Sequence, residues 1–143
     1  MAHGANQPVP TTPTISTHVL DTERGKPAVG VHVTLYRLAD DGRPLRLTQA
    51  LTDDDGRVRD LLDRPLTPGD YRLEFSFAPD LTGDATASAP AVAALAAPSA
   101  NGAAPAERLF RRLTLDLHVT DVKRGYHVPL LLAPFSITTY RGS

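Results

Sequence analysis

The sequence contains no cysteine and no tryptophan among its 143 residues, and only four phenylalanines, four tyrosines and one methionine. The lack of cysteine excludes disulfide bonds, thiolate nucleophiles and cysteine-based metal sites. The formal net charge is only -1, so no strong basic field argues for a nucleic acid or an anionic membrane as partner. No apolar run reaches the length of about 18 residues that spans a bilayer, so no transmembrane helix is expected.

The N-terminal region differs from the rest of the chain. Residues 1–14 contain three prolines and no apolar periodicity, which predicts a flexible arm ahead of a single domain at 15–143. The arm also lacks the charged and apolar regions of a signal peptide. A cytoplasmic protein is therefore expected.

Alternating apolar and polar residues predict strands along most of the domain. In residues 15–21, Ile15, Thr17 and Val19 share one face, while His18 lies on the other face with its polar neighbour Ser16. Similar segments, separated by turns rich in glycine, proline and aspartate, cover residues 31–38, 45–52, 71–77, 109–121 and 126–140. Seven or eight short strands at this spacing predict an all-β sandwich or barrel.

One segment, residues 82–106, breaks this pattern because alanine, proline, serine and glycine dominate it. Pro90 is suited to the first position of a helix and Pro98 to its end, which predicts one short helix over residues 90–97 followed by a loop. Disorder throughout the segment is the open alternative.

Histidines are the natural candidates for acid–base chemistry near neutral pH. Apart from His3 in the arm, His32 and His118 lie among outward-facing polar residues and are expected to be ordinary surface residues. His18 has a mixed face, and His127 lies between a glycine turn and a proline at the start of an apolar strand. The pattern alone favours a structural role for both, and a metal site formed by this pair lacks a third ligand.

The acidic turn at residues 53–57 reads DDDGR and invites comparison with a calcium loop. The spacing excludes an EF-hand, because placing Gly56 at loop position 6 puts Leu51 and Leu62 at the acidic positions 1 and 12. A solvated hairpin turn that presents Arg57 is the remaining interpretation. The motifs of serine-elbow hydrolases, HExxH metalloproteases and P-loop NTPases are absent from the sequence.

Three stretches together resemble the transthyretin-like family in its enzyme branch, the 5-hydroxyisourate hydrolases. They read STHVLDTERGKPAVGVHVTLYRL, TDDDGRV and YHVPLLLAPFSITTYRGS. The resemblance covers residues 15–79 and 109–143 in the same order. The main departures lie between residues 80 and 108, where an alanine- and proline-rich insertion replaces the short helix that family members usually carry.

The resemblance implies an all-β sandwich of two four-stranded antiparallel sheets with one short helix. It implies a homotetramer with active sites at the interface between dimers, and no metal or organic cofactor. The implied reaction is the hydrolytic ring opening of 5-hydroxyisourate, the product of urate oxidation, to 2-oxo-4-hydroxy-4-carboxy-5-ureidoimidazoline.

The family motifs place the implied site on seven positions of this chain. The implied catalytic residues are His18, Arg57, His127 and Ser143. The implied substrate-binding residues are His18, Arg57, Tyr140, Arg141, Gly142 and Ser143. A guanidinium suits the planar, polar and partly anionic substrate, and histidine suits the removal of a proton from water. Which histidine acts as the base stays open at this point.

Two other functions compete with this interpretation. A non-catalytic transthyretin-like protein would bind a small ligand in an open channel, which the aromatic ring of Tyr140 would narrow. A sandwich that serves only protein–protein contacts would leave His18, Arg57 and His127 unexplained as a set.

Overall fold

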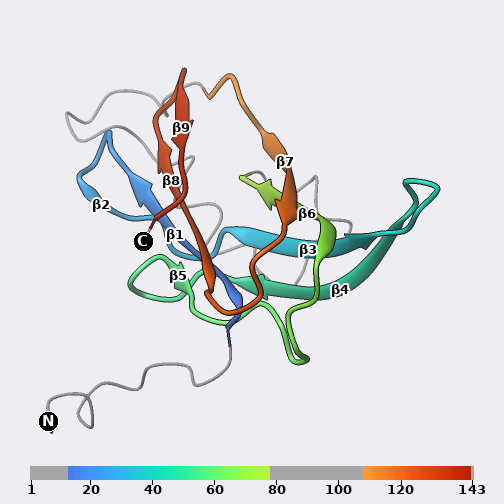
Figure 1. Ribbon diagram of the computed structural model, residues 1–143. Coiled ribbons are helices and arrows are strands. Elements are labelled where there is room, and N and C mark those ends of the chain that lie inside the picture. Colours follow the sequence, from blue (N-terminus) through green and yellow to red (C-terminus); the bar gives the residue numbers. More distant parts are fainter. Residues whose placement is uncertain (1–12, 78–107, 143) are drawn as a thin grey trace, which may run out of the picture.

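A computed structural model describes residues 13–77 and 108–142, which form nine strands (Figure 1). The strands are β1 (Ile15–Asp21), β2 (Lys26–Pro27), β3 (His32–Leu38), β4 (Pro44–Leu51), β5 (Arg57–Val58), β6 (Gly69–Ser76), β7 (Arg112–Val119), β8 (Tyr126–Leu132) and β9 (Ile137–Thr139). The two strands predicted around Pro134 are confirmed as β8 and β9.

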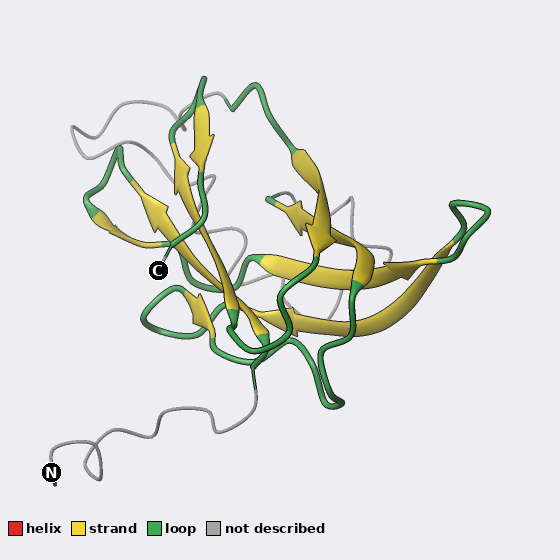
Figure 2. Cartoon of the chain, viewed as in Figure 1, coloured by secondary structure: helices red, strands yellow, loops and turns green. Residues whose placement is uncertain are grey.

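The strands form two sheets that pack into a sandwich. Sheet A has the order β2-β1-β8-β9 with β5 also paired to β1, and sheet B has the order β4-β3-β6-β7. Figure 2 shows strands and loops but no helix in the described ranges. The predicted all-β sandwich is confirmed, whereas the predicted helix at 90–97 and most of the predicted arm lie outside the described residues.

Two details of the predicted sheets are wrong. Sheet A contains a fifth strand, and β1 pairs with β8 in parallel over seven residues from Ile15 to Asp21, so this sheet is not wholly antiparallel. Antiparallel pairing is imposed by a short hairpin connection, and no such connection joins β1 to β8. Residues about one hundred positions apart in the chain therefore pair directly.

Burial shows which face of each sheet meets the core. Along β1 the residues alternate between buried and half-buried, as predicted. Val19 of sheet A and Leu35, Leu73 and Phe75 of sheet B are fully buried in the shared core. The half-buried residues Ser16 and His18 consequently lie on the outer face of sheet A.

His32 is a correction to the predicted surface histidines. It lies on β3, an interior strand, with Leu51 of β4 and Ser76 of β6 directly opposite it. These neighbours on both sides leave the residue only 5% exposed, although alternation places it on the outer face of sheet B. His118, on the edge strand β7, is exposed as predicted.

Candidate active site

The strand register gathers the main candidate side chains on the outer face of sheet A. His18 of β1 is directly opposite Arg57 of β5, and on its other side it is opposite Pro129 of β8. Two residues earlier on β1, Ser16 is directly opposite His127. Since opposite residues point to the same face of a sheet, these side chains share one surface.

A tight turn holds Arg57 in position beside β1. The backbone amides of Asp55 and Arg57 both donate hydrogen bonds to the Oδ1 atom of Asp53, at 2.9 and 3.0 Å. These bonds, led by the one from Arg57, lower the pKa of the Asp53 carboxyl. The acidic turn therefore stabilises its own shape and delivers Arg57 at its end, as the hairpin interpretation predicted.

Gly56 lets this turn lie directly against β1. The residue has a φ of 77°, and its carbonyl oxygen accepts a hydrogen bond of 2.7 Å from the amide of Val19. A β-carbon at this position would collide with the carbonyl oxygen of Val19. Only glycine combines the left-handed backbone with this close approach, so the sequence of the turn fixes Arg57 next to His18.

His127 contacts a serine of the neighbouring strand and has a lowered pKa. Its Nδ1 atom lies 2.9 Å from Oγ of Ser16, which is hydrogen-bond distance. Burial lowers the pKa of the half-buried imidazole below its usual value, and the electrostatic influence of Arg57 and His18 lowers it further. All three influences oppose protonation, so the His127 ring is neutral near pH 7.

The chain segment after β9 covers His127. The amide of Gly142 donates a hydrogen bond of 2.7 Å to the carbonyl oxygen of His127, and the two residues form an antiparallel bridge. A β-carbon on Gly142 would lie only 2.7 Å from Cδ2 of His127. The close packing of this backbone against the imidazole requires glycine at position 142.

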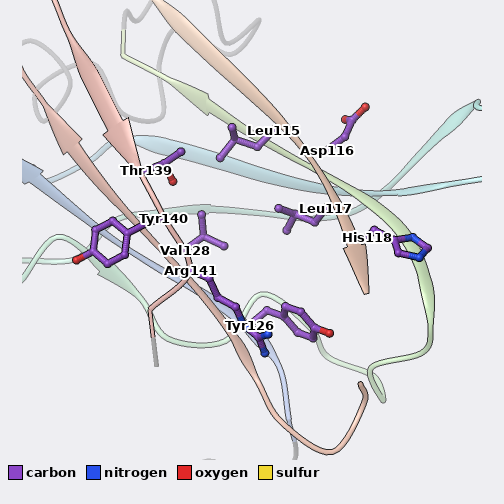
Figure 3. Close-up of a pocket in the computed structure, with 9 residues that line it drawn as sticks. All are labelled: Leu115, Asp116, Leu117, His118, Tyr126, Val128, Thr139, Tyr140 and Arg141. Atoms are coloured by element: carbon purple, nitrogen blue, oxygen red, sulfur yellow. The ribbon is translucent and has the colours of Figure 1, made fainter. Parts of the chain in front are cut away.

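Tyr140 and Arg141 lie on opposite faces of sheet A. The pairing of β8 with β9 continues to Gly142, so Tyr140 falls opposite Pro129 on the outer face, where its side chain is exposed. Arg141 instead stacks on the ring of Tyr126, with its guanidinium carbon 4.2 Å from the ring centroid. Figure 3 shows the Tyr140 side chain pointing away from this stacked pair.

Arg141 and Tyr126 help to line a depression of about 300 Å³ between β7 and the last strands. The Tyr126 hydroxyl accepts hydrogen bonds from the amides of Asp121 and Thr120, which lower the pKa of this hydroxyl. None of the residues that line this depression is His18, Arg57 or His127. The register thus places His18, Arg57, His127, Tyr140 and Gly142 on one face, although Tyr140 also borders the depression, and the Arg141 side chain lies elsewhere.

One serine was predicted at the site but lies outside the described residues, and another was not predicted but contacts His127. Ser143, the last implied catalytic residue, lies outside the described residues. Ser16 was not among the predicted site residues, although it shares the face of His18 two positions away. Its contact with His127 depends on the parallel register of β1 and β8, and no sequence pattern gives that register.

Within residues 13–77 and 108–142, no three His, Cys, Asp or Glu side chains are grouped so that they could hold a metal ion. In the same ranges, no helix is long and apolar enough to cross a membrane. The functional groups of the cluster are the neutral imidazole of His127, the imidazole of His18 and the guanidinium of Arg57. Such a set can accept a proton from water and stabilise a developing oxyanion.

Comparison with known proteins identifies the relatives of this chain. The model of the HIUase/Transthyretin family matches residues 15–142. The chain belongs to this family. A 5-hydroxyisourate hydrolase of Deinococcus radiodurans is 39% identical over 133 residues, which cover 92% of this chain and 97% of the relative. A 5-hydroxyisourate hydrolase of Halalkalibacterium halodurans is 38% identical over 90% of this chain and 97% of the relative.

Solved structures of HIUase/Transthyretin proteins have the same architecture. The structure of Klebsiella pneumoniae 5-hydroxyisourate hydrolase is similar with a TM-score of 0.61 at 32% identity, covering 92% of this chain and 94% of that one. Sea bream transthyretin in complex with thyroxine gives a TM-score of 0.66 at 22% identity, covering 90% and 93% of the two chains. At that identity the likeness to transthyretin concerns the fold alone.

Proposed function

We propose that this HIUase/Transthyretin protein is a 5-hydroxyisourate hydrolase, which opens the ring of its substrate to give 2-oxo-4-hydroxy-4-carboxy-5-ureidoimidazoline. The observation that carries the proposal is the clustering of His18, Arg57 and His127 on the outer face of sheet A. The relatives named 5-hydroxyisourate hydrolase over more than 90% of their length support the same reaction.

Arg57 binds and orients the substrate in this proposal. The substrate is a planar heterocycle rich in carbonyl oxygens, and a guanidinium offers several donors in one plane to such a ligand. The turn at Asp53 to Arg57 holds the backbone of this arginine before substrate arrives. A donor fixed in advance stabilises the negative charge that develops on the attacked carbonyl oxygen.

The two histidines share the proton transfers. One imidazole takes a proton from water while the water oxygen forms a bond to the ring carbonyl carbon. The carbon–nitrogen bond of the cyclic amide then breaks, and the released nitrogen takes a proton. Tyr140, Gly142 and Ser143 close the site around the substrate, whereas Arg141, which the family motif also implies as a binding residue, stacks on Tyr126 and acts at most indirectly.

Assembly and location are part of the same proposal. We place this outer face at the interface between dimers of a homotetramer, because Leu20 and Leu131 accompany the exposed Tyr140 on it. A catalytic cleft formed between two copies of this face would exclude water from the substrate except where the reaction needs it. A cytoplasmic location stays a prediction.

The test is to generate 5-hydroxyisourate from urate with urate oxidase and to follow its ultraviolet decay with and without this protein. We expect decay well above the spontaneous rate, proportional to the protein concentration. Decay at the spontaneous rate, from a protein whose circular dichroism spectrum shows folded β-structure, would rule out the hydrolase and favour the ligand-binding alternative.

A further inference from the structure

The imidazole of His127 is held along two of its edges. Ser16 lies at hydrogen-bond distance from Nδ1, 2.9 Å away. The backbone of Gly142 packs against the Cδ2 edge, where a β-carbon would lie only 2.7 Å away. The remaining edge, which carries Nε2, is therefore the part of the ring left for a substrate or a water molecule.

The contact with Ser16 allows two arrangements of hydrogens, since a serine hydroxyl both donates and accepts. If the hydroxyl donates to Nδ1, the neutral ring carries its hydrogen on Nε2 and offers no basic nitrogen to the site. If Nδ1–H donates to the hydroxyl, Nε2 is unprotonated and basic. Burial, Arg57 and His18 all lower the pKa of His127 and favour the neutral ring, so one of these two tautomers is present near pH 7.

We propose that Ser16 is a positioning residue for His127, accepting a hydrogen bond from Nδ1–H so that Nε2 is the atom that takes the proton from water. This inference rests on the proposed hydrolase function. The proton passes from water to Nε2 of His127 as the water oxygen bonds to the carbonyl carbon of the substrate. The amide nitrogen of the substrate, released when the carbon–nitrogen bond breaks, then receives a proton. His18 is left to deliver that second proton.

Kinetics separate this role from a merely structural one. We expect Ser16→Ala to lower kcat about 10- to 100-fold with little change in KM, because the ring loses its fixed orientation. Ser16→Thr keeps the hydroxyl and should stay within a few-fold of the wild type. Thr114→Ala removes an exposed hydroxyl from β7 on sheet B and should leave both constants unchanged. Wild-type kcat in Ser16→Ala, or equal losses in the Ala and Thr variants, would overturn the proposal.

The tautomer gives a test that does not depend on turnover. In protein labelled with ¹⁵N-histidine, the His127 signals are assigned as those missing from His127→Gln. At pH 8 we expect the proton on Nδ1 in the wild type and in Ser16→Thr, and a loss of this preference in Ser16→Ala. A proton on Nε2 in the wild type would reject the assignment. Absence of hydrolysis by the wild type would instead defeat the proposed function, while the tautomer would still confirm or reject the Ser16 contact.

Discussion

The outer faces of the two sheets differ in how their charged groups are used. On sheet B, Arg72 donates to Asp116 and His118 contacts Asp70, so basic and acidic side chains are paired across neighbouring strands. On sheet A, the two side chains that act electrostatically on His127, Arg57 and His18, are both basic. Exposed pairs such as those on sheet B contribute little to stability, whereas a cluster of basic groups suits a polar or anionic ligand.

The largest expected difference between the faces concerns their histidines. His127→Ala removes the proposed base and should lower kcat about 10²- to 10⁴-fold, the usual contribution of general acid–base catalysis. His118→Ala, on the outer face of sheet B, removes only an exposed contact with Asp70 and should leave kcat unchanged. The measurement is the rate of 5-hydroxyisourate decay with each purified variant. Full activity of His127→Ala would show that this face is not the active site.

Two glycines offer a matched test of the same contrast. Gly142→Ala places a methyl group against His127 and should lower kcat by up to about 100-fold, because small displacements of a catalytic group are costly. Gly42 of the β3–β4 turn has a φ of 85°, and a β-carbon there would meet nothing within 4 Å beyond its own chain neighbours. Gly42→Ala therefore introduces backbone strain alone.

For Gly42→Ala we expect a loss of about 1–2 kcal/mol in the free energy of unfolding with unchanged kcat. Chemical denaturation and steady-state kinetics on both variants provide the comparison. A Gly142→Ala variant that loses only stability and keeps its kcat would contradict a catalytic role for the packing of Gly142 against His127.

A smaller effect separates two roles for Arg141. Its stacking on Tyr126 predicts that Arg141→Ala lowers kcat/KM only a few-fold, since an exposed cation–π contact is worth about 0.5–1 kcal/mol. A direct hydrogen bond to substrate would be worth about 1.5–3 kcal/mol, and its loss would cost at least tenfold. Tyr126→Leu should then reproduce the small effect, because it removes the same stack. A large loss in Arg141→Ala alone would assign the guanidinium to the substrate.

The smallest predicted effect is a dependence of stability on pH. Because the pKa of His127 is lower in the folded chain than in the unfolded chain, the unfolded chain binds more protons between the two values. The free energy of unfolding should therefore fall as the pH drops below about 6.5, the unfolded value. In His127→Gln this part of the fall should be missing. Identical pH profiles of denaturation for the two proteins would contradict the lowered pKa.

Alternation in the sequence predicted the faces of β1 and β6 because half-buried strands must place every second residue in the core. The resemblance to the transthyretin-like family then selected His18, Arg57 and His127 from among the polar residues. Local patterns could not predict which strands pair, since pairing depends on contacts between distant segments. The Ser16 contact, the fifth strand of sheet A and the burial of His32 all follow from such pairing.

The parallel pairing of β1 with β8 also has a consequence for the order of folding. Ser16 and His127 are 111 positions apart in the chain, whereas β3 and β4 of sheet B are joined by a short turn. Contacts between distant segments form slowly, because a long loop must close before any of them is made. The β3–β4 hairpin can therefore form early, while the pairing of β1 with β8 in sheet A must wait for the last part of the chain. During refolding from denaturant, β-structure should return before enzymatic activity does.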